Sequence, residues 1–133
     1  MARRTLAALG RADREVHVTV VDDRRIRALN ARYLGKRQAT DVLAFDLAGP
    51  GPARLWGEVI VSAETAARQA RRVGVPLAME LDLLVVHGLL HLAGYDDYGP
   101  RRARRMHERA REILAGRTPR AVPPRLWTGL LER

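Results

Sequence analysis

The sequence predicts an α+β fold, in which a small mixed β-sheet is packed with helices. Short apolar or alternating runs that are typical of strands occur three times. Longer stretches with apolar residues at three- and four-residue spacing, bounded by capping residues, predict five helices. The predicted order is helix, strand, helix, strand, strand and then three helices, which is the order of an α+β domain.

The N-terminal part predicts a short helix and a strand. The helix covers residues 5–9 and ends at Gly10. Residues 15–21 predict a strand with one buried face, because polar and apolar side chains alternate from Glu15 to Val20. The apolar face carries Val16, Val18 and Val20. His17 belongs to the other face, so we expect it at the surface.

A helix and two strands come next. Asp22 or Asp23 can cap the helix, and Gly35 would end it. Its apolar positions recur every three or four residues, at Ile26, Leu29 and Tyr33. Residues 42–47 and 56–61 predict the two strands, and the Gly- and Pro-rich segment 49–52 joins them.

Three helices complete the predicted domain, which spans residues 1–133. They cover residues 62–72, 76–92 and 100–115. Ser62 is a natural N-cap for the first, and Gly74 closes it. The second is apolar nearly all round, so we expect it to be the central, buried helix. Residues 117–133 predict an irregular tail that contains proline.

The composition limits the chemistry that this domain can perform. The chain has 133 residues, no cysteine and a net charge of +9. Without cysteine there is no disulfide, zinc ribbon or iron–sulfur cluster, so a metal site must use histidine and carboxylates. The chain has no apolar run of about 18 residues and no signal-peptide pattern, so we expect a cytoplasmic protein without a membrane partner.

The charge is unevenly distributed along the chain. Residues 1–37 carry a net charge of +6, residues 38–100 carry −4, and residues 101–133 carry +7. Two basic ends around an acidic middle favour a polyphosphate partner such as nucleic acid. The alternative interpretation is a solvated arginine-rich surface, which also applies to Arg101, Arg102, Arg104 and Arg105 on the last helix.

Two histidines lie on the predicted buried helix. His87 and His91 are four residues apart, which places them on one helix face with Cβ atoms about 5–6 Å apart. Gly94 lets the chain turn back, so that Asp97 can supply a third ligand, whereas Asp96 fits a turn acceptor better. Two histidines and one carboxylate leave the open position of a catalytic zinc site. The alternative is a structural histidine pair.

Gly88 argues against one metal-dependent reaction. Zinc proteases with the sequence His-Glu-x-x-His use the glutamate as general base, and Gly88 occupies that position here. Glycine cannot accept a proton, so a peptidase is disfavoured. Metal-assisted cleavage of a phosphodiester agrees better with the basic ends of the chain.

A longer motif surrounds the two histidines. Residues 87–97 read His-Gly-Leu-Leu-His-Leu-Ala-Gly-Tyr-Asp-Asp. Before it, in order, come Asn30-x-x-Tyr33, the segment Thr40-Asp41-Val42-Leu43-Ala44-Phe45 and the segment Gly57-Glu58-Val59-Ile60-Val61-Ser62. Together these motifs resemble the YbeY family of bacterial metal-dependent endoribonucleases, whose signature is His-Gly-x-Leu-His-Leu-x-Gly-Tyr-Asp-His.

The resemblance implies a single-strand-specific endoribonuclease that acts in maturation of the 16S rRNA 3′ end and in ribosome quality control. It implies one zinc ion on His87, His91 and Asp97, with His87 and His91 also catalytic. The implied partners are ribosomal RNA and the ribosome, together with ribosomal proteins and assembly factors. The oligomeric state stays open.

Two positions depart from the family pattern. Asp97 stands where the family has histidine, and its negative charge makes a bound ion less Lewis-acidic. Leu34 stands where the family has an arginine that grips the RNA phosphate, and Arg32, Lys36 and Arg37 are the candidates to replace it. These departures keep a second function open, that of a ribosome assembly factor in which the metal is structural and cleavage is weak or absent.

Overall fold

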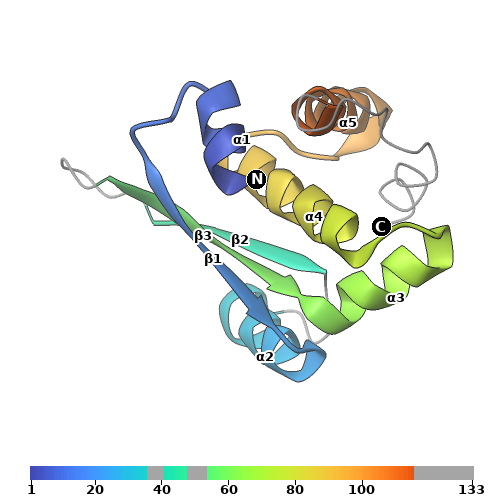
Figure 1. Cartoon of the computed structure of the whole chain (residues 1–133). Helices are drawn as coiled ribbons and strands as arrows, with labels where there is room; N and C mark the ends of the chain where they lie inside the picture. Colours follow the sequence, from blue (N-terminus) through green and yellow to red (C-terminus); the bar gives the residue numbers. More distant parts are fainter. Residues whose placement is uncertain (36–40, 48–53, 116–133) are drawn as a thin grey trace.

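Figure 1 shows the computed structural model of the chain, which describes residues 1–35, 41–47 and 54–115. The elements follow the predicted order. They are α1 (Ala2–Ala8), β1 (Glu15–Val21), α2 (Asp23–Leu34), β2 (Val42–Asp46), β3 (Leu55–Ser62), α3 (Ala63–Val73), α4 (Leu77–Leu92) and α5 (Gly99–Ala115). The predicted loop 49–52 and tail 117–133 lie outside the described residues.

The three strands form a mixed sheet in the order β1-β3-β2. β1 runs parallel to β3, with Val18 opposite Val59. β2 runs antiparallel to β3, with Ala44 also opposite Val59. The most buried strand is therefore in the middle, and the predicted mixed sheet is confirmed.

Helices cover both faces of the sheet (Figure 1). Val59 and Val61 of β3 pack against Leu84 and Leu89 of α4 on one face. Ile60, which points the opposite way, packs against Ile26 of α2 on the other face. The alternation of β3 thus divides the core, with α1 and α4 on one side and α2 on the other.

α4 is the central helix of the molecule. One side of α4 packs on the sheet, and another side packs on α3 and α5 through Leu83, Val86 and Leu90. Because its neighbours surround it, apolar side chains are buried nearly all round. The prediction of a central buried helix is therefore confirmed, and it places the segment around His87 and His91 between two layers of structure.

Local sequence signals explain where two helices begin and end. The side chain of Asp22 accepts a hydrogen bond from the N–H of Arg25, and the hydroxyl of Ser62 accepts one from the N–H of Thr65. Gly35 and Gly74 end the same helices with φ of 69° and 72°, a conformation that glycine adopts without steric cost. Asp22 is therefore the cap of α2, one of the two predicted candidates.

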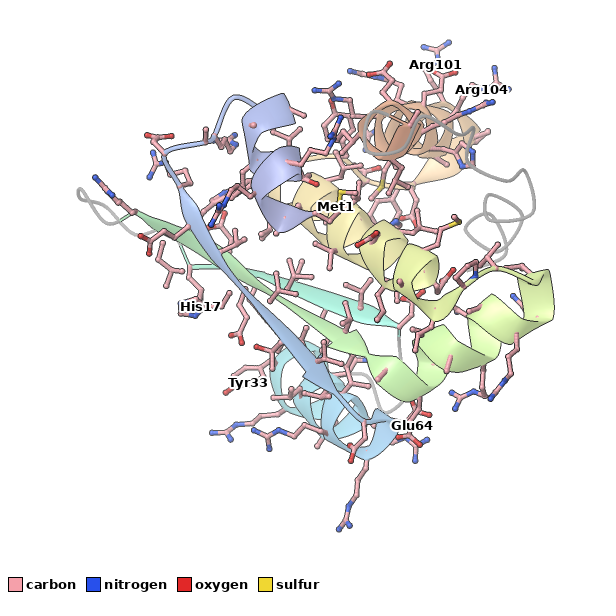
Figure 2. All side chains as sticks on the ribbon, viewed as in Figure 1. Met1, His17, Tyr33, Glu64, Arg101 and Arg104 are labelled. Atoms are coloured by element: carbon pink, nitrogen blue, oxygen red, sulfur yellow. The ribbon has the colours of Figure 1, made fainter. Side chains whose placement is uncertain are left out.

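Two predictions about burial were wrong. Val18 and Val20 were expected on a buried face but are 40% and 56% exposed, because β1 is an edge strand and α4 packs over β2 and β3. Tyr33 was expected on the apolar face of α2 but is 56% exposed, and its ring touches Phe45 edge-on at 5.6 Å between centroids. His17 is exposed as expected (Figure 2).

The length and hydropathy of the helices in the described part of the chain bear on membrane crossing. No single helix there is long and apolar enough to span a bilayer. α3 and α4 pass that test only as a pair, and they are bent by 117° relative to each other.

Candidate metal centre

The two predicted ligand histidines meet on α4. Their Nε2 atoms lie 3.0 Å apart, and their rings cross at 74° with centroids 4.6 Å apart. The four-residue spacing on a helix produces this approach because such residues stack on one helix face. The predicted juxtaposition of His87 and His91 is therefore present.

The distance between the two Nε2 atoms fits a hydrogen bond within a structural histidine pair, and it also fits a shared metal ion. Two nitrogens at about 2.0–2.1 Å from one tetrahedral zinc would be roughly 3.3 Å apart, close to the distance found here. Nδ1 of His87 is buried and has no hydrogen-bond partner among residues 1–35, 41–47 and 54–115. The pair thus offers two nitrogen donors that converge on one point, which is what a ligand pair requires.

Burial controls the charge of His87. It lowers the pKa of His87 to about 4, and the neighbouring His91 acts in the same direction. The carboxylates of Asp41 and Asp97 act in the opposite direction. The imidazole of His87 is therefore neutral near pH 7, the form that binds metal ions.

The third ligand is less clearly placed than the pair. No group of three metal-ligating side chains is assembled within the described residues. Asp97 is exposed in the loop after α4, although its charge reaches His87. Asp41, directly before β2, reaches His87 in the same way. Asp96 instead accepts a hydrogen bond from the N–H of Tyr98 at 3.0 Å, the turn role expected for it.

Gly88 has a structural role that its sequence context did not indicate. A Cβ at this position would lie 2.6 Å from Cγ1 of Val59 and 3.2 Å from Cγ2 of Val42. The absence of a side chain therefore lets α4 approach the sheet closely beside His87. A glutamate at this position, as in zinc proteases, would not fit this packing.

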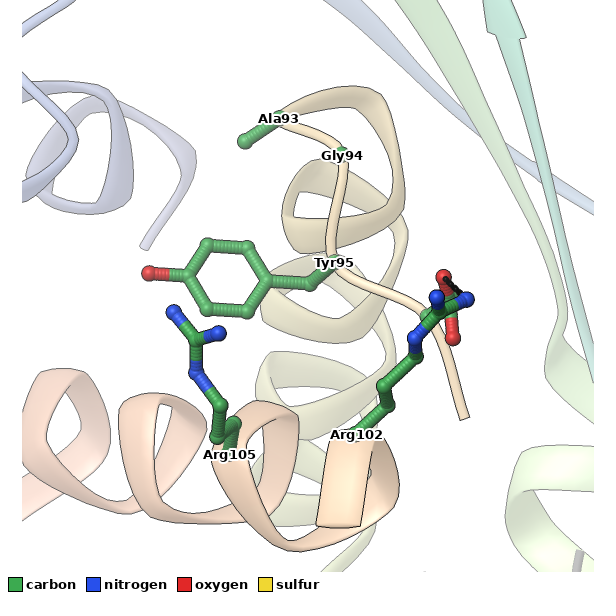
Figure 3. Close-up of a pocket in the computed structure, with 6 residues that line it drawn as sticks. Ala93, Gly94, Tyr95, Arg102 and Arg105 are labelled. Carbon is green, nitrogen blue, oxygen red and sulfur yellow. Dashed lines mark hydrogen bonds and ion pairs between the residues drawn. The ribbon is translucent and has the colours of Figure 1, made fainter. Parts of the chain in front are cut away.

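A pocket of about 490 Å³ lies beside the loop that carries Asp97 (Figure 3). Its lining comes from the end of α4, the following loop and the first turns of α5, through Ala93, Gly94, Tyr95, Asp96, Arg102 and Arg105. Part of the arginine cluster of α5, Arg102 and Arg105, thus lines a cavity at the turn that follows His91, which the spacing of the arginines alone did not indicate.

The candidate phosphate-binding residues lie elsewhere or outside the described part. Arg32 is in the last turn of α2, across the sheet from α4, with its guanidinium 5.3 Å from the centre of the Tyr33 ring. Lys36 and Arg37 lie outside the described residues. The structure therefore does not bring Arg32 to the histidine pair.

Trp56 and His107 are both packed into the structure. Trp56 is 5% exposed, and the guanidinium of Arg11 lies 4.6 Å from the centre of its ring. His107 is half-buried on α5. Neither is therefore a candidate ligand or stacking platform, and Trp127 lies outside the described residues.

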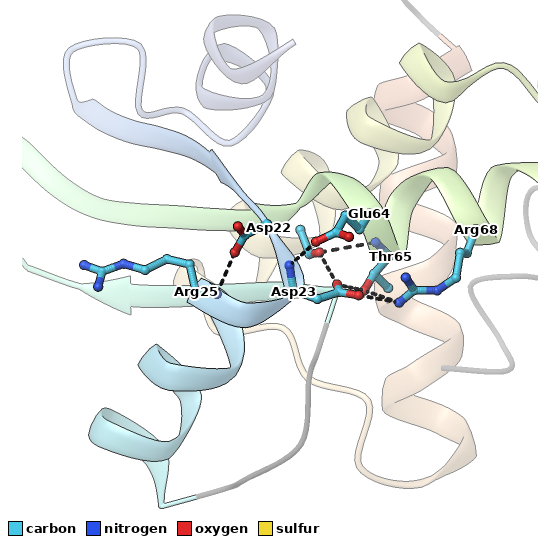
Figure 4. A network of polar contacts seen from close by, with 7 residues as sticks. Asp22, Asp23, Arg25, Glu64, Thr65 and Arg68 are labelled. Atoms are coloured by element: carbon cyan, nitrogen blue, oxygen red, sulfur yellow. Dashed lines mark hydrogen bonds and ion pairs between the residues drawn. The ribbon is translucent and has the colours of Figure 1, made fainter.

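A second polar cluster connects α2 to α3 (Figure 4). Oδ1 of Asp23 accepts hydrogen bonds from the hydroxyls of Ser62 at 2.5 Å and Thr65 at 2.6 Å. Its Oδ2 pairs with Nη2 of Arg68 at 2.8 Å. Ser62, Thr65 and Arg68 recur every three residues, so one helix face presents three donors. The three-residue spacing of these donors is visible in the sequence. Their shared acceptor, Asp23, is not predictable from it, because it lies about 40 positions away.

The Asp23 cluster makes folding stability depend on pH. The hydrogen bonds from Ser62 and Thr65, and then Arg68, lower the pKa of Asp23 from 3.8 to about 2. The stabilisation is complete above pH 4 and disappears as the pH falls through 2, because the unfolded chain binds the proton first. Asp23→Asn should therefore lower the free energy of unfolding by about 1–2 kcal/mol at pH 7. Urea unfolding of both proteins measures this difference.

Asp22→Asn is the matched control for that experiment. Asparagine caps a helix as well as aspartate does, so this change should leave stability nearly unchanged at pH 7. The difference between wild type and Asp23→Asn should shrink toward zero at pH 2. A difference that stays constant between pH 7 and pH 2 would contradict the assignment to the Asp23 charge.

The fold and the histidine pair define a small α+β protein with a two-histidine metal-binding candidate on its central helix. The sequence model of the family described as Endoribonuclease YbeY matches residues 2–117. A protein named Endoribonuclease YbeY from Anaeromyxobacter sp. (strain Fw109-5) is 52% identical over 109 residues, which cover 81% of this chain and 57% of that protein. The chain belongs to the YbeY family.

Other relatives extend this comparison. A protein of the same name from Geobacter metallireducens is 43% identical over 122 residues, covering 86% of this chain and 81% of that protein. A solution structure of a Thermotoga maritima protein superposes with a TM-score of 0.60 and 26% identity, covering 98% of this chain and 82% of the other. The chain spans little more than half the length of the two Anaeromyxobacter relatives, 57% and 56%.

Proposed function

We propose that this protein is a metal-dependent endoribonuclease that cuts single-stranded RNA. We further propose that it acts in the cytoplasm on ribosomal RNA, at the 3′ end of 16S rRNA, and in ribosome quality control. Membership of a family described as Endoribonuclease YbeY supports the reaction class. The observation that carries the metal dependence is the approach of the His87 and His91 Nε2 atoms to 3.0 Å.

Each residue of the proposed site has a distinct task. His87 and His91 would hold one zinc ion through Nε2, and Asp97 would add a carboxylate from the loop after α4. Zinc bound there supplies Lewis acidity that stabilises negative charge on phosphate oxygens. Gly88 brings the helix onto the sheet beside the ligands and so fixes their backbone.

The charge distribution supports RNA as the substrate. The proposed ligands lie in the acidic middle of the chain, whereas residues 101–133 carry a net charge of +7. Arg102 and Arg105 line the pocket at the turn after His91, and such cations favour a polyanion because they attract phosphates. The ribosome, its proteins and assembly factors are the proposed partners.

Removing the metal tests this proposal. We expect the protein reconstituted with zinc to hold about one ion per chain and to cut single-stranded RNA while a duplex of the same sequence stays intact. A chelator should stop cleavage, and added zinc should restore it. Elemental analysis and gel electrophoresis of labelled RNA measure the two quantities.

Two negative outcomes have different meanings. A reconstituted protein that holds no metal would disprove the metal site. A protein that holds zinc but leaves single-stranded RNA intact would disprove the nuclease and favour the assembly factor with a structural metal. The departure at Asp97 is the observation that motivates this second candidate, because a carboxylate ligand weakens the Lewis acidity of the ion.

A further inference from the structure

The pocket beside the Asp97 loop presents one arginine that is not used inside the protein. Arg102 is held by Oδ2 of Asp96 at 3.3 Å. Arg105 makes no hydrogen bond or ion pair with any residue that the structure describes. In Figure 3 its guanidinium points toward the hydroxyl of Tyr95 across the pocket. The pocket therefore contains a free cation next to a hydroxyl donor.

The pocket walls are fixed by contacts on the protein side. Tyr95 packs against the core cluster of α4 and α5, so its ring has a defined position. The N–H of Tyr95 donates to the carbonyl of Leu90 at 3.0 Å, and the N–H of Gly94 donates to that of His91 at 3.1 Å. Asp96 fixes both Arg102 and the N–H of Tyr98. The pocket is thus built on the same turn that follows His91.

The chemistry of this pocket suits a phosphate group. A guanidinium binds phosphate oxygens through two parallel N–H donors, and a tyrosine hydroxyl can donate a third hydrogen bond. The carboxylate of Asp96 would repel an anion, but Arg102 is paired with it and reduces that effect. The positive charge of Arg105 is therefore the one in the pocket that no carboxylate of the described residues neutralises.

We infer that this pocket binds a backbone phosphate of single-stranded RNA, next to the bond that is cut. The assignment rests on the proposed function, since it takes RNA as the ligand. The pocket begins two residues after His91, and Gly94, which lines it, is hydrogen-bonded to the carbonyl of His91, so the pocket and the histidine pair share one end of α4. Arg105 and Tyr95 thereby position the strand, whereas the histidines hold the metal.

Binding of RNA to the metal-free protein tests the pocket separately from cleavage. The probe is a fluorescein-labelled single-stranded RNA of 12 nucleotides, measured by anisotropy at several salt concentrations. We expect Arg105→Ala to weaken binding about 5- to 10-fold and to reduce the slope of log K against log salt by about 0.7, the value for one phosphate contact on a single strand. Tyr95→Phe, which keeps the ring in place, should weaken binding about 2- to 3-fold.

Arg104→Ala and Arg101→Ala are the matched controls. Each substitution removes one positive charge from α5, as Arg105→Ala does, but Arg101 and Arg104 are exposed (Figure 2) and neither lines the pocket. They should change affinity less than 2-fold. Equal losses for Arg101, Arg104 and Arg105 would overturn the pocket in favour of general attraction. Circular dichroism checks that each variant keeps its helices.

Two further arms separate the possible causes of failure. Inorganic phosphate at 5 mM and constant ionic strength should not displace the RNA, and displacement that depends on Arg105 would assign the pocket to free phosphate instead. Cleavage of the same RNA by the zinc-loaded wild type reports on the proposed function. Cleavage with equal binding by all arginine variants disproves only the pocket, whereas Arg105-specific binding without cleavage disproves only the nuclease.

Discussion

Under the proposed function, replacing His91 with alanine should abolish zinc binding and slow RNA cleavage by at least about 100-fold, which corresponds to about 3 kcal/mol of lost transition-state stabilisation. The reason is geometric. His87 and His91 have Nε2 atoms that lie 3.0 Å apart. Without His91, the helix provides only one nitrogen ligand. Elemental analysis and single-turnover cleavage measure the two losses together.

His17→Ala is the matched control for this change. His17 is exposed on β1 and faces away from the layer that contains α4, so its loss should affect neither metal content nor rate. His91→Ala should also keep its fold, which circular dichroism verifies. A His91→Ala protein that keeps both its zinc and its cleavage rate would refute the proposed ligand set.

Gly57→Ala should destabilise the fold by about 2 kcal/mol even though it adds one methyl group. A Cβ at this position would lie 2.5 Å from the backbone oxygen of Phe45 and 2.8 Å from Cδ1 of Leu92. Phe45 belongs to β2, which is hydrogen-bonded to β3, so its oxygen cannot move away without weakening the sheet. The better strand propensity of alanine offsets only about 0.5–1 kcal/mol. Urea unfolding measures the net effect.

A double variant separates the two contacts of that methyl group. In Gly57→Ala combined with Leu92→Ala, the contact with Cδ1 of Leu92 is gone, while the contact with the Phe45 oxygen remains. The two changes should therefore cost less together than the sum of their separate costs. Strict additivity would show that Leu92 does not resist the new methyl group.

Local signals made the helix ends and the histidine pair predictable. The α3 cap requires only Ser62 and the N–H three residues later, and Gly74 closes the helix by its own backbone freedom. The approach of His87 to His91 likewise follows from helix geometry alone. Structure of this kind can be derived from the sequence, because the interacting residues are only three or four positions apart.

Features that depend on distant partners could not be derived in this way. The alternation of β1 indicates which valines share a face, but the exposure of Val18 and Val20 depends on where α4 lies. The bonds from Ser62 and Thr65 to Asp23 join segments about 40 residues apart. Asp97 is a candidate ligand from spacing, but its place relative to the histidines depends on the turn after α4. Each of these outcomes is decided by tertiary packing.

The mixed sheet also constrains the order in which the chain assembles. Asp46 and Gly57 of β2 and β3 pair across about ten residues, whereas Val18 of β1 must find Val59 across roughly 40. Closing a longer loop costs more conformational entropy before any contact compensates for it. We therefore expect β2 and β3 to pair first. β1 then joins an existing template at its edge. We therefore expect β1, although it comes early in the sequence, to join the sheet late.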